Sequence, residues 1–120
     1  MIMNTILIDG NSLTLKDLAL IARENYKVEI KDEAKKKVEK SRAIVDDIVE
    51  NEKTIYGITT GFGKFANVSI SKEDCKTLQR NLIISHACGT GNNLPTETVR
   101  AIMLLRANAL SKGFSGIRLS

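Results

Sequence analysis

The sequence predicts a mainly α-helical structure in which helices surround a glycine-rich loop. Four stretches, residues 14–25, 32–51, 71–85 and 95–112, carry apolar side chains at the spacing of one helix face. Residues 54–68 contain three glycines within seven positions, which disfavours a helix there. With 120 residues, of which 42% are hydrophobic and 27% charged, the chain has the size and composition of about one globular domain.

The N-terminal region is predicted to begin with a short strand or extended segment at residues 5–9, followed by a turn at residues 10–12. Thr14 and Asp17 have the spacing of a capping box, so we expect a helix to begin there and to end near Asn25. The inward face of this helix is predicted to consist of Leu15, Leu18, Ala19 and Ala22.

The second helix, residues 32–51, is predicted from an amphipathic stripe. The stripe consists of Ala34, Val38, Ser41, Val45 and Ile48, and it is widened by Ile44 and Val49. Lysines interleaved with acidic residues occupy most of the opposite side, without aromatic residues among them. Because nucleic-acid-binding faces usually combine basic residues with stacking aromatics, we interpret this basic stretch as a solvated helix surface and expect no nucleic-acid partner.

Two further helices are predicted in the C-terminal half. Ser71 and Asp74 form a second capping box, and the helix after them is expected to run to about Ser85. Its inward residues are predicted to be Cys75, Leu78, Leu82 and Ile83. The last helix has Pro95 in its first turn and runs to about Lys112 with few polar residues, so it is expected to be buried on more than one side. We therefore expect a piece of a longer chain, or a domain that needs a partner.

Several classes of protein are disfavoured by simple patterns. No apolar run approaches the roughly 20 residues of a membrane-spanning helix, and the first residues lack the basic and apolar regions of a secretory signal. Cys75 and Cys88 are too few for a disulfide framework, so reduced thiols and a cytoplasmic location are expected. No metal is expected, because His86 is the only histidine and the cysteines form no CxxC pair.

The glycine-rich segment fits a loose G-x-G-x-x-A pattern over residues 61–66, but it does not predict a nucleotide site. A dinucleotide fingerprint requires a helix that opens directly on the glycines and an acidic residue about 20 positions later. The next predicted helix begins only near Ser71, and no acidic residue lies at that distance beyond Gly63. A P-loop is excluded as well, because Lys64 is followed by Phe65.

Tyr56 and His86 each allow two interpretations. Tyr56 either anchors the loop or acts as a general base or acid. A free phenol is a poor base because its pKa is about 10. Backbone N–H groups of a glycine-rich loop can lower that pKa. His86 either sits at a helix C-terminus, where the dipole favours it, or faces a ligand from a loop. Spacing alone does not decide between the two interpretations for either residue.

Three longer segments, in this order, resemble one family. They are IYGITTGFGKFANVSI at residues 55–70, LQRNLIISHACGTG at 78–91 and RAIMLLRANALSKGFSGIR at 100–118, and the opening ILIDGNSLTLKDLALIAR adds to them. Together they resemble the N-terminal part of the histidine ammonia-lyases, within the wider family of aromatic amino acid ammonia-lyases and aminomutases. The resemblance covers essentially the whole chain and implies the N-terminal part of a fumarase/aspartase-like fold in a homotetrameric enzyme.

The resemblance implies a reaction and a set of roles. The complete protein would remove ammonia from L-histidine to give trans-urocanate, the first step of histidine degradation. Tyr56 would be the general base for the β-proton, and Gly57 and Gly61 would shape its loop. Gly63 would lie near the substrate.

Substrate choice is set in this family at the positions of Ser85 and His86. A polar pair there favours a substrate whose imidazole nitrogens need partners, so His86 is the expected contact for the substrate side chain. Two departures from the family are small: Thr59 stands where asparagine is common, and Cys88 where alanine is common. Neither is expected to touch the chemistry.

The family's electrophile is absent from these residues. This group, 4-methylidene-imidazole-5-one (MIO), forms from an Ala-Ser-Gly tripeptide that the chain does not contain, and the Phe114–Gly116 segment is not a substitute. The 120 residues alone are therefore expected to be inactive. The alternatives are a phenylalanine or tyrosine ammonia-lyase or aminomutase of the same family, and a truncated, non-catalytic interaction module.

Overall fold

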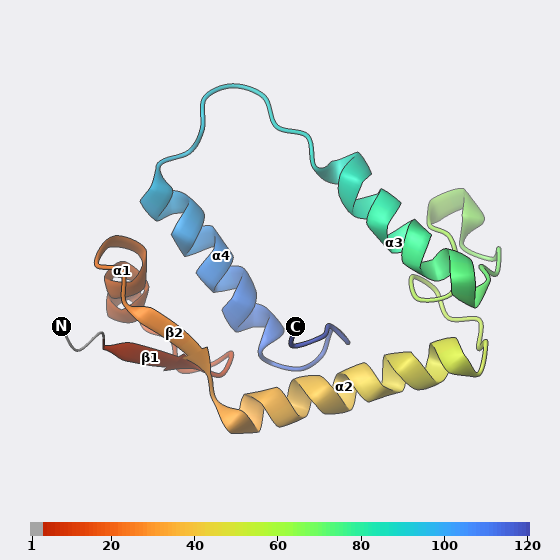
Figure 1. Ribbon diagram of the computed structural model, residues 1–120, viewed down its shortest axis with the longest axis horizontal. Helices are drawn as coiled ribbons and strands as arrows, with labels where there is room; N and C mark the ends of the chain where they lie inside the picture. The colour runs from red at the N-terminus through yellow and green to blue at the C-terminus, as the bar shows by residue number, and fades with distance from the viewer. Residues whose placement is uncertain (1–3) are drawn as a thin grey trace. The chain divides into compact units, whose positions relative to one another are not determined.

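The structure is a computed structural model that describes residues 4–120, and it confirms that the chain is mainly helical (Figure 1). Its elements are β1 (Thr5–Ile8), α1 (Leu15–Arg23), β2 (Lys27–Ile30), α2 (Asp32–Glu50), the 3₁₀ helix η1 (Gly63–Phe65), α3 (Lys72–His86) and α4 (Thr96–Leu110). The chain divides into two compact units. The terminal unit comprises the chain up to Arg42 together with Asn93–Ser120, and the loop unit comprises Ala43–Asn92. Among the described residues, no helix has the length and hydrophobicity needed to cross a membrane.

A small βαβ arrangement opens the terminal unit. β1, predicted from the sequence, pairs in parallel with β2, so that Thr5 lies opposite Lys27 and Ile8 opposite Ile30. β2 was not predicted, because four residues with two apolar side chains are too short to show a period. Its formation depends on pairing with β1, which the sequence around Lys27 does not reveal.

The core of the terminal unit forms where α1 and the strands meet α4. Ile8, Ile21 and Leu104 are buried there. The capping box of α1 is confirmed: the Thr14 hydroxyl accepts from the Asp17 N–H, and the Asp17 carboxylate accepts from the Thr14 N–H.

Not every predicted inward residue is buried. Leu15 was predicted to face inward but is 85% exposed, because it is the first residue of α1 and the residues that reach the core come one or two turns later. In α2, Ala34 and Val38 are buried as predicted, whereas Ile44, expected to widen the stripe, is exposed.

The last helix, α4, packs against α1 but is not enclosed. Pro95 occupies the N-cap position rather than the first turn, and the helix begins at Thr96. Leu104 faces the core, while Ile102 and Met103 on other sides of the helix are more than half exposed. The prediction that this helix is buried on more than one side is therefore wrong for the described residues. In these residues, α4 is covered on the side where α1 and the strands pack against it.

The loop unit contains the end of α2, the glycine-rich segment and α3. Ser71 caps α3 by accepting from the Asp74 N–H, as predicted. Cys75 is buried on the inward face of α3, but Ile83, also predicted inward, is 70% exposed because the loop covers only the first turns of the helix.

Candidate functional site

The segment between α2 and α3 folds as a loop closed by a short antiparallel bridge. Thr60 pairs with Ser69 across this bridge, the Ile70 N–H donates to the Thr59 carbonyl at 2.9 Å, and the Gly61 N–H donates to the Val68 carbonyl at 3.3 Å. Apart from the 3₁₀ turn η1, the segment is non-helical, in agreement with the loop predicted for residues 54–68. We call residues 53–70 the tyrosine loop.

An ion pair fixes the start of the tyrosine loop. Lys53 Nζ donates to Asp47 Oδ2 at 2.7 Å, and Asn51 Nδ2 donates to Asp47 Oδ1 at 2.8 Å. The hydrogen bond and charge of Lys53 hold the pKa of the Asp47 carboxyl below its usual value. The chain therefore leaves α2 with Lys53 attached to the last turns of that helix.

Tyr56 projects from the tyrosine loop with its side chain 63% exposed. Its ring meets Phe62 edge to face, with the ring centroids 6.0 Å apart and an interplanar angle of 74°. The phenol is accessible from solvent, which a residue that exchanges protons with a small molecule requires.

The three glycines of the loop differ in their conformations. Gly57 and Gly63 have φ values of 76° and 57°, in the left-handed region that favours glycine. Gly61 is buried beside the Thr60–Ser69 bridge. A Cβ atom at Gly63 would have no atom within 4 Å, so open space lies beside this residue.

Ser85 and His86 form the exposed C-terminal end of α3. His86 Nδ1 lies 2.8 Å from the Leu82 carbonyl oxygen and 3.1 Å from Ser85 Oγ, and the Ser85 hydroxyl donates to the same carbonyl at 2.8 Å. Because a carbonyl only accepts, this geometry places the proton of the neutral ring on Nδ1. Nε2 is then left as a hydrogen-bond acceptor.

The structure brings the predicted residues together in two groups rather than one. Tyr56 and the three glycines share the tyrosine loop, which is anchored at the first turns of α3 through Cys75. Ser85 and His86 lie at the other end of α3, roughly 16 Å from Cys75 at 1.5 Å per residue.

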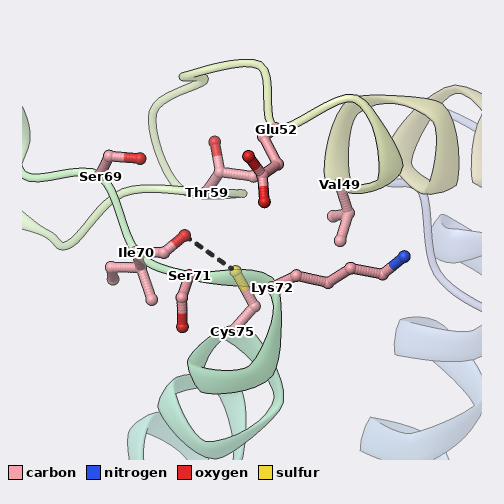
Figure 2. Close-up of a pocket in the computed structure, with 8 residues that line it drawn as sticks. All are labelled: Val49, Glu52, Thr59, Ser69, Ile70, Ser71, Lys72 and Cys75. Carbon is pink, nitrogen blue, oxygen red and sulfur yellow. Dashed lines mark hydrogen bonds between the residues drawn. The ribbon is translucent and has the colours of Figure 1, made fainter.

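A cavity of about 280 Å³ lies where the tyrosine loop meets α2 and α3 (Figure 2). It is lined by Val49, Glu52, Thr59, Ser69, Ile70, Ser71, Lys72 and Cys75. The Cys75 thiol lies 3.8 Å from the carbonyl oxygens of Ile58 and Ile70, the second of which Figure 2 shows. None of the predicted site residues lines this cavity, and among residues 4–120 no cluster of three or more potential metal-ligating side chains occurs.

Buried hydroxyls in the tyrosine loop were missed from the sequence. Thr59 and Thr60 are among the most deeply buried polar residues of the described chain, and both bond to the backbone near Tyr56. The available signal was the presence of two adjacent threonines between Tyr56 and Gly61, but a hydroxyl in a loop does not reveal its partners.

Comparisons with known proteins agree with one another. Residues 13–120 match the model of the family described as aromatic amino acid lyase. Over 114 residues the chain is 68% identical to histidine ammonia-lyase of Clostridium tetani (strain Massachusetts / E88), covering 95% of this chain and 22% of that protein.

The chain also matches solved structures over most of its length. The structure of histidine ammonia-lyase from Trypanosoma cruzi matches with a TM-score of 0.87 and 40% identity, over 96% of this chain and 22% of that one. The ergothioneine-degrading enzyme ergothionase from Treponema denticola matches with a TM-score of 0.88 and 35% identity, over 96% and 23%. The chain thus spans about a fifth of the length of the relatives that it matches.

Proposed function

This chain belongs to the aromatic amino acid lyase family, and we propose that the complete protein is a histidine ammonia-lyase. It would eliminate ammonia from L-histidine without oxidation to give trans-urocanate, the first step of histidine degradation. The observation that carries this proposal is the high identity to the Clostridium tetani enzyme over nearly the entire chain. A fumarase/aspartase-like fold, helices around the active-site loop, a homotetramer and a cytoplasmic location form part of the same proposal.

In this proposal Tyr56 is the general base that removes the β-proton of histidine. Three observations support it: Tyr56 is exposed, it lies four residues before the Thr60–Ser69 bridge that closes the loop, and open space lies beside Gly63 in the same loop. Gly57 and Gly61 shape the loop, and Gly63 lies next to the substrate. A base must reach its proton at hydrogen-bond distance, so the fixed loop backbone is part of the catalytic arrangement.

His86 and Ser85 are proposed to recognise the substrate side chain. With Nδ1 donating to Leu82, the neutral His86 ring offers Nε2 as an acceptor, which suits the N–H of a neutral imidazole. The phenyl ring of phenylalanine has no such donor and would leave Nε2 unpartnered. This tautomer therefore favours a substrate whose side chain carries a hydrogen-bond donor, such as histidine, over phenylalanine.

The described residues do not supply the electrophile of the family. The family uses MIO, which is built from Ala-Ser-Gly, and this tripeptide is absent from the 120 residues. In the Phe114–Gly116 segment, the Gly116 N–H donates to Ser41 Oγ at 3.0 Å and the Gly116 carbonyl accepts from Arg42 Nη1 at 3.2 Å, so its backbone serves as an anchor on α2. We therefore expect the 120-residue chain alone to be inactive.

The reaction is tested by following urocanate formation from histidine in the complete enzyme by ultraviolet absorbance. Tyr56→Phe should lower kcat at least about 100-fold, the usual contribution of a general base. Tyr26→Phe is the matched control, because Tyr26 is the other tyrosine of the chain and lies in the terminal unit, where its hydroxyl accepts from Asn4 at 3.3 Å. Equal activity of the Tyr56→Phe and unmodified enzymes would contradict the role of Tyr56.

Substrate choice needs a separate test. His86→Leu should lower kcat/KM for histidine at least about 10-fold, because one hydrogen-bond partner of the substrate imidazole is lost. Gln79→Leu, at an exposed position on the same helix, is the control. If the unmodified enzyme instead converts tyrosine or phenylalanine faster than histidine, or forms a β-amino acid, the protein is one of the related lyases or aminomutases.

A further inference from the structure

Two buried threonines hold the backbone on either side of Tyr56. Thr59 and Thr60 have exposed fractions of 4% and 1%. Thr59 Oγ1 accepts from the Ile55 N–H at 2.9 Å and donates to the Lys53 carbonyl at 2.5 Å. Thr60 Oγ1 accepts from the Gly57 N–H at 3.3 Å and donates to the Gly61 carbonyl at 3.0 Å.

The two threonines act on the backbone on both sides of the tyrosine. Thr60 Oγ1 accepts from the Gly57 N–H, which belongs to the peptide group that joins Tyr56 to Gly57. Thr59 Oγ1 accepts from the N–H of Ile55, and the Ile55 carbonyl, in the peptide group that joins Ile55 to Tyr56, accepts from the Thr59 N–H at 3.0 Å. Because a peptide group is planar, fixing these amides restricts the direction in which the Tyr56 Cβ leaves the backbone.

Within the described residues, Tyr56 is largely open to solvent. It is 63% exposed, and its ring meets that of Phe62 edge to face. An exposed side chain has few contacts of its own that could select one orientation. Within the described residues, the restraint comes from the chain to which this side chain is attached.

The threonines themselves are fixed to the rest of the loop unit. The Thr59 carbonyl accepts from the Ile70 N–H at 2.9 Å, and Thr60 pairs with Ser69. Ile70 directly precedes the Ser71 cap of α3, and its carbonyl lies next to the Cys75 thiol. The restraint on Tyr56 is therefore continuous with the start of a regular helix.

We propose that Thr59 and Thr60 are positioning residues for the reaction of Tyr56, each acting through the backbone amide on one side of it. The proposal rests on the proposed function for the role of the phenol. It changes the expectation that Thr59 is remote from the chemistry: its hydroxyl makes this residue part of the arrangement that holds Tyr56.

The proposal is tested in the complete enzyme with valine, which keeps the shape of threonine and removes the hydroxyl. Thr59→Val and Thr60→Val should each lower kcat for histidine by about 10-fold to 100-fold, the effect expected for a misplacement of roughly 1 Å. KM should change by less than about threefold, because both threonine side chains are buried within the loop and bond to its backbone. Thr59→Ser and Thr60→Ser should recover most of the lost kcat, since serine restores the hydroxyl.

Thr54→Val is the matched control, because Thr54 is an exposed threonine two residues before Tyr56. A double-mutant cycle shows whether the effect passes through Tyr56: in a Tyr56→Phe background, Thr59→Val should cause little further loss. Fully additive losses would overturn the positioning role. Valine variants with unchanged kcat would also overturn it. Unchanged activity of Tyr56→Phe alone would instead defeat the proposed role of Tyr56 as the general base, and a complete enzyme that forms no urocanate would defeat the proposed function.

A measurement on the unmodified enzyme keeps the proposal testable if a valine variant does not fold. Hydrogen exchange resolved to single residues by fragment-ion mass spectrometry should show slow exchange at the amides of Ile55 and Gly57. The amide of Lys64, an exposed residue in η1, provides a reference for fast exchange. Exchange at Ile55 and Gly57 as fast as at Lys64 would contradict the two hydrogen bonds on which the proposal depends.

Discussion

Arg100 of α4 donates two hydrogen bonds to the backbone carbonyl of Ile21 in the last turn of α1, from Nη2 at 2.6 Å and from Nε at 3.2 Å. Carbonyls in the last turn of a helix have no partner within that helix, and the negative end of the helix dipole lies there. A single guanidinium therefore caps α1 and attaches it to α4, which lies 79 positions further along the sequence.

Removal of this cap should destabilise the terminal unit. Arg100→Ala is expected to lower the free energy of unfolding by about 1–2 kcal/mol, since hydrogen bonds to a charged group are lost and a part-buried carbonyl is left unpaired. Arg106→Ala, at an exposed position on the same helix, should change it by less than about 0.5 kcal/mol. Urea unfolding followed by circular dichroism compares the two variants, and equal shifts would show that the Ile21 contact contributes nothing.

Asp9 should make the stability of the terminal unit depend on pH. Its carboxylate accepts from Lys31 Nζ at 2.7 Å and from the N–H groups of Asn11 and Ser12, and these bonds, that of Lys31 foremost, lower the pKa of Asp9 well below its ordinary value of 3.8. A carboxyl whose pKa is lower in the folded state stabilises the protein above the ordinary value and loses this contribution as the pH falls further.

The expected result is a loss of stability as the pH falls below about 4 that is smaller in Asp9→Asn than in the unmodified protein. Lys31→Met removes the main cause of the shift and should also weaken the dependence. Thermal unfolding at a series of pH values measures both variants. Parallel curves for Asp9→Asn and the unmodified protein would rule out Asp9 as the source.

The helices were predictable because their signals are local. The Thr14 and Ser71 caps lie within three residues of the groups they bind, and the stripe through Ala34 and Val38 repeats within one helix. β2 was missed because its strand character depends on β1, more than 20 residues earlier in the chain.

The candidate site was predictable only in part, for a related reason. The YGxxTGFG segment marked Tyr56 and its glycines, and the loop conformation followed from the glycine content. The hydroxyl contacts of Thr59 and Thr60 depend on how the loop folds back on itself, which residue identity does not encode. Leu15 and Ile83 were wrongly predicted to be buried. Periodicity shows which face of a helix is apolar, but it does not show how far along the helix other residues cover that face.

Two glycines that both have φ values in the left-handed region should respond differently to substitution by alanine. Gly63 and Gly113 have φ values of 57° and 77°. A Cβ at Gly113 would lie 2.8 Å from the Lys37 Cβ and carbonyl carbon, whereas one at Gly63 would meet nothing within 4 Å. Gly63→Ala should therefore cost only the backbone strain of about 1–2 kcal/mol, and Gly113→Ala should cost clearly more. Free energies of unfolding test this order, and equal costs would contradict the close contact with Lys37.

The two cysteines should report whether the tyrosine loop stays closed on α3. Cys88 is exposed, whereas Cys75 is only 8% exposed. The Cys75 thiol lies against the carbonyls of Ile58 and Ile70, which belong to the two strands of the loop that meet at the Thr60–Ser69 bridge. Iodoacetamide should therefore modify Cys88 quickly in the native protein, and Cys75 only when the loop leaves the helix or the protein is unfolded in urea. Peptide mapping by mass spectrometry gives the rate at each thiol. Native-state modification of Cys75 at the rate of Cys88 would mean that the loop is open most of the time, in which case hydroxyls in that loop could not hold Tyr56 in one position.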